Sequence, residues 1–165
     1  MREIRPEELQ KNPFQMIGKE WLLVTAEKDG KANTMTASWG GVGIMWGRPV
    51  AYVFIRPQRY TKEFIDSTDT FSLSVLGEEY RKTLNYFGTV SGRDEDKIGK
   101  SGLHLAHEGE TPYFEEANTV MICRKLYAQS YDPACFIDKS CEEKWYPNKD
   151  YHMMYIVEIE KVLVD

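Results

Sequence analysis

Short apolar or alternating runs, separated by turn residues, make up most of this chain and predict strands. Glu20–Lys28 and Lys31–Ser38 flank the pair Asp29-Gly30. An Asp-Gly pair between two extended runs is a strong hairpin signal, because both turn positions favour positive φ. Val50–Ile55 is apolar on both faces, which is typical of a strand covered on both sides. These runs predict an antiparallel start to a sheet.

The remaining patterns add more strands and only short helices. We expect strands over Thr70–Leu76, Asn118–Gln129 and Tyr151–Val164, and helices over Lys62–Asp66 (capped by Thr61), Glu78–Phe87 (stopped by Gly88) and Asp94–Ile98. The rest of Thr89–Glu116 is polar and irregular, and Tyr131–Asp150 resembles a loop with some helix. Because strands dominate, the chain is predicted to be one mainly β domain over residues 1–165, an antiparallel barrel with short peripheral helices.

Charge and hydropathy narrow the partners. The net charge of −5 argues against a general nucleic-acid binder, since phosphate backbones require clustered positive charge. No apolar run reaches the ~20 residues of a membrane span, and the first residues lack the apolar core of a signal peptide. We therefore expect a cytoplasmic protein that binds neither nucleic acid nor membrane.

The cysteines and histidines do not predict a metal site. Cys123, Cys135 and Cys141 include no Cys-x-x-Cys pair, so we expect reduced thiols, with a redox role of Cys135 and Cys141 left open. His104 and His107 lie three apart without an acidic partner at metalloenzyme spacing, and are expected at the surface.

Arg56-Pro-Gln-Arg-Tyr-Thr61 is the first candidate binding segment. Pro57 ends a strand, and Arg59 directly precedes a predicted helix N-terminus. Guanidinium groups, free helix N–H groups and the hydroxyls of Tyr60 and Thr61 could converge on one phosphate. The alternative is that Arg56 and Arg59 pair with surface carboxylates.

The second candidate is the strand end before Gly40-Gly41. Its backbone could supply N–H groups to a flat heterocycle, with Trp39 or Trp46 as an apolar wall. The alternative is an ordinary strand that runs into a glycine-rich turn. The side chains alternate between two faces: Thr34, Thr36 and Ser38 on one, and Met35, Ala37 and Trp39 on the other. Aligned hydroxyls suit an aqueous edge or a polar ligand.

The third candidate is Ser91-Gly-Arg-Asp-Glu-Asp-Lys97. Ser91, Gly92, Arg93 and Lys97 could offer a hydroxyl, a close backbone and cations to the same ligand. Alternatively, this charge run is a capped, solvated helix. The dinucleotide, P-loop and nucleophile-elbow patterns are all missing from the sequence.

Four motifs together resemble a known family. The motifs are Asn33-Thr-Met-Thr-Ala-Ser-Trp-Gly-Gly, Ile55-Arg-Pro-Gln-Arg-Tyr-Thr, Ser91-Gly-Arg-Asp-Glu-Asp-Lys-Ile and Asp150-Tyr-His-Met-Met-Tyr-Ile-Val-Glu-Ile. In this order they resemble the flavin reductase-like FMN-binding split-barrel proteins, and the flavoredoxin-like branch is the closest fit. The resemblance spans Trp21 to Val164.

The resemblance implies a Greek-key split β-barrel that forms a homodimer, with FMN in a groove at or near the subunit interface. The segment Met35–Trp39 would lie along the isoalloxazine ring, and Arg56–Thr61 would take the ribityl phosphate. Ser91–Lys97 resembles the family's Ser-x-x-x-Asp-Lys/Arg-Phe element, here ending in Ile98. Flavin reductases open their last strand with Gly-Asp-His, and here only His152 carries over, as a contact of nicotinamide or flavin.

The resemblance implies an FMN-dependent oxidoreductase that reduces flavin with NAD(P)H or transfers electrons through bound FMN. Alternatives are a flavoredoxin-type electron carrier or a non-catalytic flavin-binding module, neither of which uses NAD(P)H directly. A third alternative is a barrel that binds another phosphorylated ligand. The sequence does not specify the electron donor, which could be a small molecule or a protein, nor the acceptor.

Overall fold

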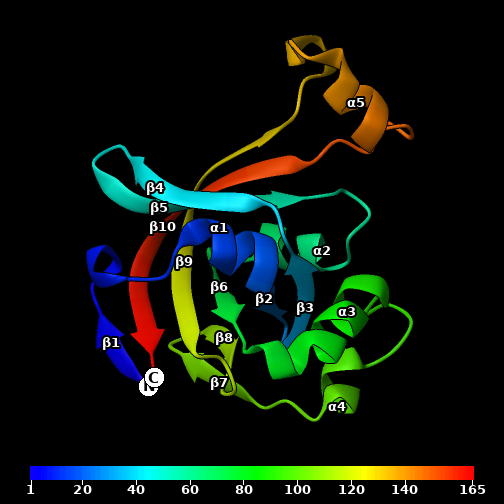
Figure 1. Cartoon of the computed structure of the whole chain (residues 1–165). Helices are drawn as coiled ribbons and strands as arrows, with labels where there is room; N and C mark the ends of the chain where they lie inside the picture. The colour runs from blue at the N-terminus through cyan, green and yellow to red at the C-terminus, as the bar shows by residue number, and fades with distance from the viewer.

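A computed structural model describes all 165 residues, and strands dominate it. Helices are short and lie around the strands (Figure 1). The strands are β1 (Arg2–Ile4), β2 (Leu22–Lys28), β3 (Lys31–Ala37), β4 (Gly40–Met45), β5 (Arg48–Ile55), β6 (Thr70–Val75), β7 (Leu105–Glu108), β8 (Thr111–Phe114), β9 (Thr119–Ser130) and β10 (Met153–Val164). The helices are α1 (Pro13–Gln15), α2 (Thr61–Ser67), α3 (Arg81–Thr89), α4 (Lys97–Ser101) and α5 (Lys139–Trp145), with a π-helical turn at Met16–Glu20 and 3-10 turns at Pro6–Glu8, Glu78–Tyr80 and Pro133–Cys135.

One antiparallel sheet builds the body of the molecule. Its strands follow the order β3-β2-β6-β9-β10-β5-β4, and β1 pairs with β10 beside this path. The two end strands, β3 and β4, are consecutive in the sequence and are joined by Ser38 and Trp39 alone. The sheet therefore curls until its ends meet at this link, yet β3 and β4 share no ladder of hydrogen bonds. The prediction of a mainly β, antiparallel barrel with short helices is confirmed.

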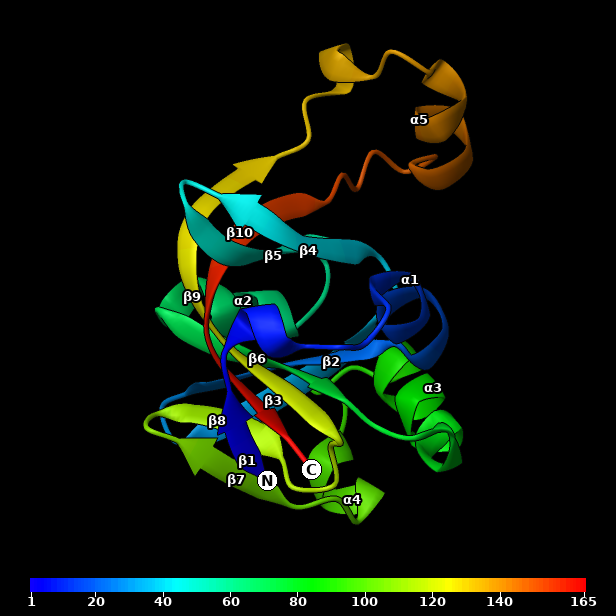
Figure 2. The same ribbon diagram turned by 60° about the vertical axis from the view of Figure 1, so that its left-hand side comes forward.

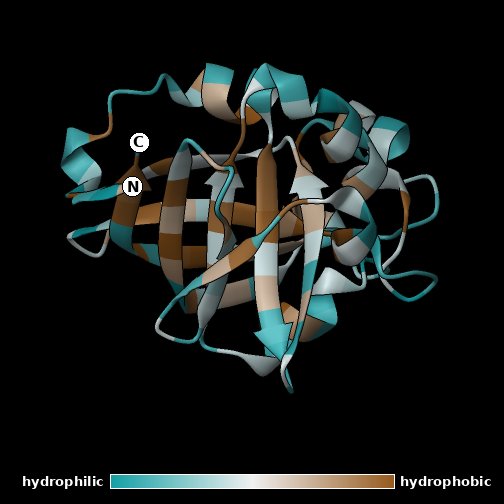
Figure 3. Cartoon of the chain, turned by 90° about the horizontal axis from the view of Figure 1, so that it is seen from below, coloured by the Kyte–Doolittle hydropathy of each residue, from teal (hydrophilic) through white to brown (hydrophobic).

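The core follows from the strand pattern. Most of a buried cluster of 20 apolar side chains comes from β2, β5, β6, β9 and β10. The other members are Phe64 and Ile65 of α2, Met35 of β3, and Met16 and Ile17 of the π-helical turn. Figure 3 shows these brown, apolar positions concentrated on the strands, whereas teal positions gather on the surrounding helices and loops. A second cluster lies where α3 packs on the sheet and includes Leu84 and Phe87. The predicted hairpin turn is also present, with positive φ at Asp29 and Gly30.

Several local predictions are wrong. Glycine-rich Gly40–Met45 is a strand, and the stretch expected to be irregular contains the hairpin β7–β8. Thr61 is the first residue of α2 and not its cap, and α3 passes through Gly88 to Thr89. The helix predicted to begin at Asp94 is α4, which begins at Lys97 after the cap Asp96. None of the helices combines the length and the apolar character that a membrane span requires.

Of the three hydroxyl residues expected at an aqueous edge or a polar ligand, Ser38 is exposed, whereas Thr34 and Thr36 bond within the protein. Thr34 is fully buried, and its hydroxyl lies 2.9 Å from that of Thr25 on the neighbouring strand. The Thr36 hydroxyl donates to the Leu84 carbonyl of α3 at 2.6 Å. Helix α3 covers this face and approaches it closely at Gly88, where an added Cβ would lie in van der Waals contact, 3.4 Å from Thr36 Cβ.

Residues 131–151, here called the arm, connect β9 to β10 and project away from the barrel. Figure 1 and Figure 2 show the arm in orange above β5 and β10, with α5 at its outer end. Neither α5 nor the 3-10 turn before it contains a buried residue.

Candidate functional site

Two adjacent cavities open beside β3, and Met35 and Arg59 line both of them. The first, the Trp39 cavity, has a volume of about 190 Å³, and the second, the Lys97 cavity, about 100 Å³. The Trp39 cavity is lined by Met35, Thr36, Ala37, Ser38, Trp39, Phe54, Arg56, Arg59, Trp145 and His152. The Lys97 cavity is lined by Asn33, Met35, Gln58, Arg59, Tyr60, Thr61, Gly88, Thr89, Val90, Ser91, Gly92 and Lys97.

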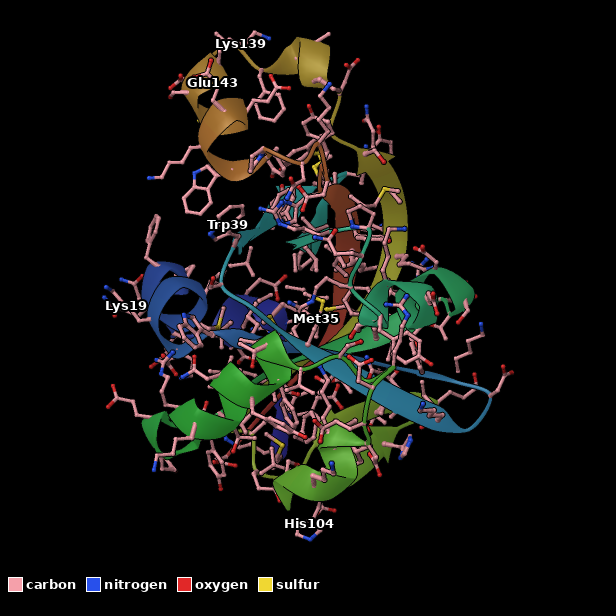
Figure 4. All side chains as sticks on the ribbon, turned by 90° about the vertical axis from the view of Figure 1, so that its right-hand side faces the viewer. Lys19, Met35, Trp39, His104, Lys139 and Glu143 are labelled. Atoms are coloured by element: carbon pink, nitrogen blue, oxygen red, sulfur yellow. The ribbon has the colours of Figure 1, made fainter.

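Trp39 lies at the two-residue link between the ends of the sheet. The backbone can pass through this link because the next residue is Gly40. Gly40 has φ +149°, and an added Cβ there would lie only 2.6 Å from the Tyr52 carbonyl oxygen of β5. Only glycine tolerates that approach. Figure 4 shows Met35 in the body of the barrel and Trp39 at its edge, on the side of the arm.

Aromatic rings gather around Trp39. The Trp145 ring meets it edge-on, with centroids 4.9 Å apart, and the His152 ring lies at 5.2 Å. His152 Nδ1 and the Tyr146 hydroxyl are 2.6 Å apart. Burial, with a smaller contribution from the nearby Arg56, lowers the pKa of His152 to about 4. His152 is therefore neutral at physiological pH and has Nε2 left for a ligand.

Arg56 is occupied by the arm. Its Nη1 lies 2.8 Å from Asp150 Oδ2, and its Nη2 donates to the Trp145 carbonyl at 2.9 Å. Its guanidinium also lies over the Tyr146 ring, 4.8 Å from the centroid. In the structure, Arg56 therefore pairs with a carboxylate, which was the alternative to phosphate binding.

The Lys97 cavity holds two cations without a carboxylate partner. Arg59 Nη1 donates to the Gly88 carbonyl at 3.0 Å, and Lys97 Nζ donates to the carbonyls of Phe87 and Val90 at 2.8 and 2.9 Å. Only 3% of Lys97 is exposed. Burial, followed by repulsion from Arg59, lowers the pKa of Lys97 to about 8, and burial lowers the pKa of Arg59 as well. Both depressed pKa values indicate positive charge that nothing in the protein balances.

The loop at Gly92 approaches β3 closely. An added Cβ at Gly92 would lie 2.0 Å from Asn33 Oδ1, so the loop needs glycine here. Asn33 is buried and donates through Nδ2 to the Thr61 hydroxyl at 2.8 Å. This bond connects β3 to the first residue of α2. The cavity is thereby held from three segments that are distant in the sequence.

The residues fit a ligand with a ring and an anionic group. Unbalanced cations suit a phosphate in the Lys97 cavity, and the aromatic lining suits a flat ring in the Trp39 cavity. Of the predicted site residues, Trp46 lines neither cavity and is exposed, and Arg93 lines neither cavity as well. Its guanidinium lies 2.7 Å from Glu63 Oε1 and stacks over Tyr60 at 4.7 Å, so we leave it out of the site.

The sequence patterns missed several lining residues. Phe54 was placed on a strand but not in the site, because an apolar strand residue gives no sign of which cavity it borders. Trp145 belongs to a segment interpreted as a loop. Of these residues, only Asn33 could have been found from the sequence, because it is a polar side chain at a strand position. Elsewhere, His104 and His107 are exposed and lie within hydrogen-bonding distance of Glu116 and Glu27, respectively.

Fold and site together define a split-barrel protein with a joined pair of ligand cavities. The comparisons with known proteins give the family: the model described as "Flavin reductase like domain" matches residues 16–165. The chain therefore belongs to the flavin reductase-like domain family, and this membership supports flavin binding.

Individual proteins resemble this chain in sequence or in fold. An uncharacterized protein of Aeropyrum pernix is 29% identical over 125 residues, which are 73% of this chain and 46% of that protein. The match thus spans about half the length of this relative. A flavoredoxin from Methanosarcina acetivorans has a TM-score of 0.70 at 21% identity, covering 88% of this chain and 68% of that chain. An FMN-binding domain of a flavin reductases-like enzyme from Shewanella baltica has a TM-score of 0.70 at 17% identity, covering 98% and 75%.

Proposed function

We propose that this protein is an FMN-dependent oxidoreductase, with the flavin ring in the Trp39 cavity and the ribityl phosphate in the Lys97 cavity. One observation carries the proposal: Arg59 and Lys97 face one small cavity, bond only to carbonyl groups, and have no carboxylate partner. Buried charge is costly unless it is paired, and a phosphate dianion is the partner that two such cations lack.

The chain's own residues bind and orient the cofactor. The segment Met35–Trp39 borders the ring from β3, and its backbone can hydrogen-bond the ring's polar edge. Arg59, shared by both cavities, is suited to the junction between ring and phosphate. Thr61 and Ser91 add hydroxyls at the phosphate end. When bound, FMN would supply hydride or electron transfer at its N5 atom.

NAD(P)H is the proposed reductant, with His152 as a contact of nicotinamide or flavin. His152 lines the Trp39 cavity in its neutral form, so it offers a hydrogen bond without adding a charge. The competing hypothesis is a flavoredoxin-type carrier, which would exchange electrons with a partner and would not oxidise NAD(P)H.

We further propose a homodimer that works in the cytoplasm. Large apolar side chains are exposed near the Trp39 cavity and on the arm, among them Phe14 at 85% and Ile137 at 100%. A dimer interface would cover such exposed apolar side chains. All three cysteines are free, which suits a reducing compartment. Sedimentation analysis should give twice the chain mass; a monomer with FMN bound would contradict the dimer but not the flavin site.

The cofactor test uses two arginine variants. The wild-type protein should retain FMN after purification or reconstitution, seen as flavin absorbance bands. Arg59→Ala should lose most of the FMN, because it removes one of the two unpaired cations. Arg48→Ala is the matched control, since Arg48 is an arginine at the start of β5 that already pairs with Glu158 at 3.0 Å. Equal flavin content in both variants would contradict the phosphate site.

The reductant test adds NADH and NADPH to the FMN-loaded protein without oxygen. Bleaching of the flavin bands by either nucleotide supports the reductase. Bands that persist with both nucleotides but bleach with dithionite would favour the carrier.

A further inference from the structure

Polar contacts and a few aromatic contacts fix the arm to the barrel. Helix α5 itself has no buried residue, and Tyr146, which directly follows it, is the one buried residue of the arm. Arg56, at the end of β5, reaches the arm at three points: the Asp150 carboxylate, the Trp145 carbonyl and the Tyr146 ring. Gln58 Nε2 adds a hydrogen bond of 2.8 Å to the same Asp150 oxygen.

Asp150 makes the attachment of the arm depend on the charge of Arg56. Both donors bind Oδ2, while Oδ1 is buried and has no hydrogen-bond partner. Without the guanidinium, a partly buried carboxylate would lose its counter-charge, and the arm would have to move to hydrate it.

The attachment also fixes the position of Trp145. The edge-on contact with Trp39 puts both indoles at the mouth of the Trp39 cavity, where Trp39 is 40% and Trp145 is 44% exposed. Two partly exposed aromatic rings beside the Trp39 cavity present apolar surface that a flat molecule can cover.

We propose that Arg56 is a positioning residue that fixes the arm, so that Trp145 and Trp39 form an aromatic rim on which a planar reactant stacks before it meets the flavin. This inference rests on the proposed function and adds the class of reactant, a planar aromatic donor or acceptor. It assigns Arg56 to the arm and not to the phosphate, although the sequence favours the phosphate for both arginines.

The first experiment separates these two roles of Arg56. Arg56→Met keeps an unbranched apolar side chain and removes the charge. Arg48→Met is the control at the opposite end of β5. Arg56→Met should leave the dissociation constant of FMN within about threefold of wild type. It should also increase hydrogen–deuterium exchange of the α5 amides, in FMN-free protein as well. Arg48→Met should change neither. A loss of FMN affinity of tenfold or more, or unchanged exchange in α5, would overturn the proposal.

A conservative variant adds a second check. Lys at position 56 can pair with Asp150, but it cannot donate in the same planar fork to the Trp145 carbonyl. Arg56→Lys should therefore restore α5 protection in part. Full loss in Arg56→Lys would show that charge is not what holds the arm.

The second experiment tests the rim with quinoline, a flat uncharged ligand, titrated into FMN-loaded protein by flavin difference spectroscopy. Trp145→Ala should weaken quinoline binding about three- to tenfold, as expected for loss of one aromatic contact. Arg56→Met should weaken it similarly, whereas Trp46→Ala, which removes another exposed indole, should not. With a planar reductant the same variants should raise KM with little change in kcat. No binding at millimolar quinoline, or equal binding by all variants, would overturn the rim.

The two proposals can fail separately. The exchange measurement needs no flavin, so a wild-type protein that cannot bind FMN would refute the proposed function while the Arg56 attachment is still tested.

Discussion

FMN affinity should fall as pH rises from 7 to 9, and Lys97 should be the cause. Without ligand, the pKa of Lys97 is about 8 because the ammonium group is buried beside Arg59. The charged fraction is then about nine-tenths at pH 7 and about one-tenth at pH 9. A phosphate dianion binds the charged form, and the phosphate keeps its own charge in this range because its second pKa is about 6.

The expected magnitude follows from this titration. If bound phosphate keeps Lys97 protonated through pH 9, the dissociation constant rises about tenfold between pH 7 and pH 9, or about 1.4 kcal/mol of binding free energy. Arg59 does not contribute to the slope, because a guanidinium stays charged throughout. By linkage, binding must take up protons over the same range.

The assay is a titration of FMN fluorescence with flavin-free protein at pH 7, 8 and 9 and constant ionic strength. Riboflavin is the matched ligand control: it has the ring but no phosphate, so its affinity should stay level. Lys97→Gln should bind FMN more weakly at pH 7 and lose the slope, and thermal melts of both proteins should show that the variant folds. A level FMN affinity in wild type, or an unchanged slope in Lys97→Gln, would refute the reasoning.

Three further changes test the surroundings of the site. Gly92→Ala should lower stability by about 1–3 kcal/mol and weaken FMN binding, since its Cβ would lie 2.0 Å from a buried amide oxygen; Gly18→Ala, with nothing within 4 Å, is the control, and equal melting temperatures would contradict this. Acidification from pH 6.5 to 4 should destabilise the protein by up to about 3 kcal/mol through His152, because the unfolded chain binds that proton first when the folded pKa is about 4; denaturant titrations should show a shallower pH slope in His152→Gln, and identical slopes would refute it. Tyr155→Phe should cost about 1–2 kcal/mol in urea unfolding by removing the 2.5 Å bond to Asp66, and no loss would show that the bond contributes nothing.

The fold was largely predictable because strand patterns are local. Asp29-Gly30 specifies its turn by backbone preference alone, and Val50–Ile55 specifies a covered strand by its composition. The sequence fails where a strand lacks apolar alternation. In β4, Gly40 is required because its backbone passes close to the Tyr52 carbonyl oxygen, and the local sequence pattern does not reveal that neighbour.

The candidate site was predictable as a set of segments but not as a set of contacts. Met35–Trp39 line one cavity together because they are contiguous on a strand. Arg93, in contrast, forms an ion pair with Glu63, which belongs to a different segment. The sequence alone does not identify this partner, because only the folded structure places α2 beside the loop that carries Arg93.

Arg56 and Arg59 make this limit concrete. They lie three residues apart after one strand, and no local property distinguishes them. Their difference arises from what the fold brings to each: Asp150 and the arm reach Arg56, whereas Arg59 meets only the Gly88 carbonyl and the equally unpaired Lys97. A cation with a carboxylate partner gains little from a phosphate, while one without such a partner gains much, because the cost of its burial has not been offset. Which arginine binds the anion is therefore decided by residues far away in the sequence, and the paired variants at positions 56 and 59 measure that difference directly.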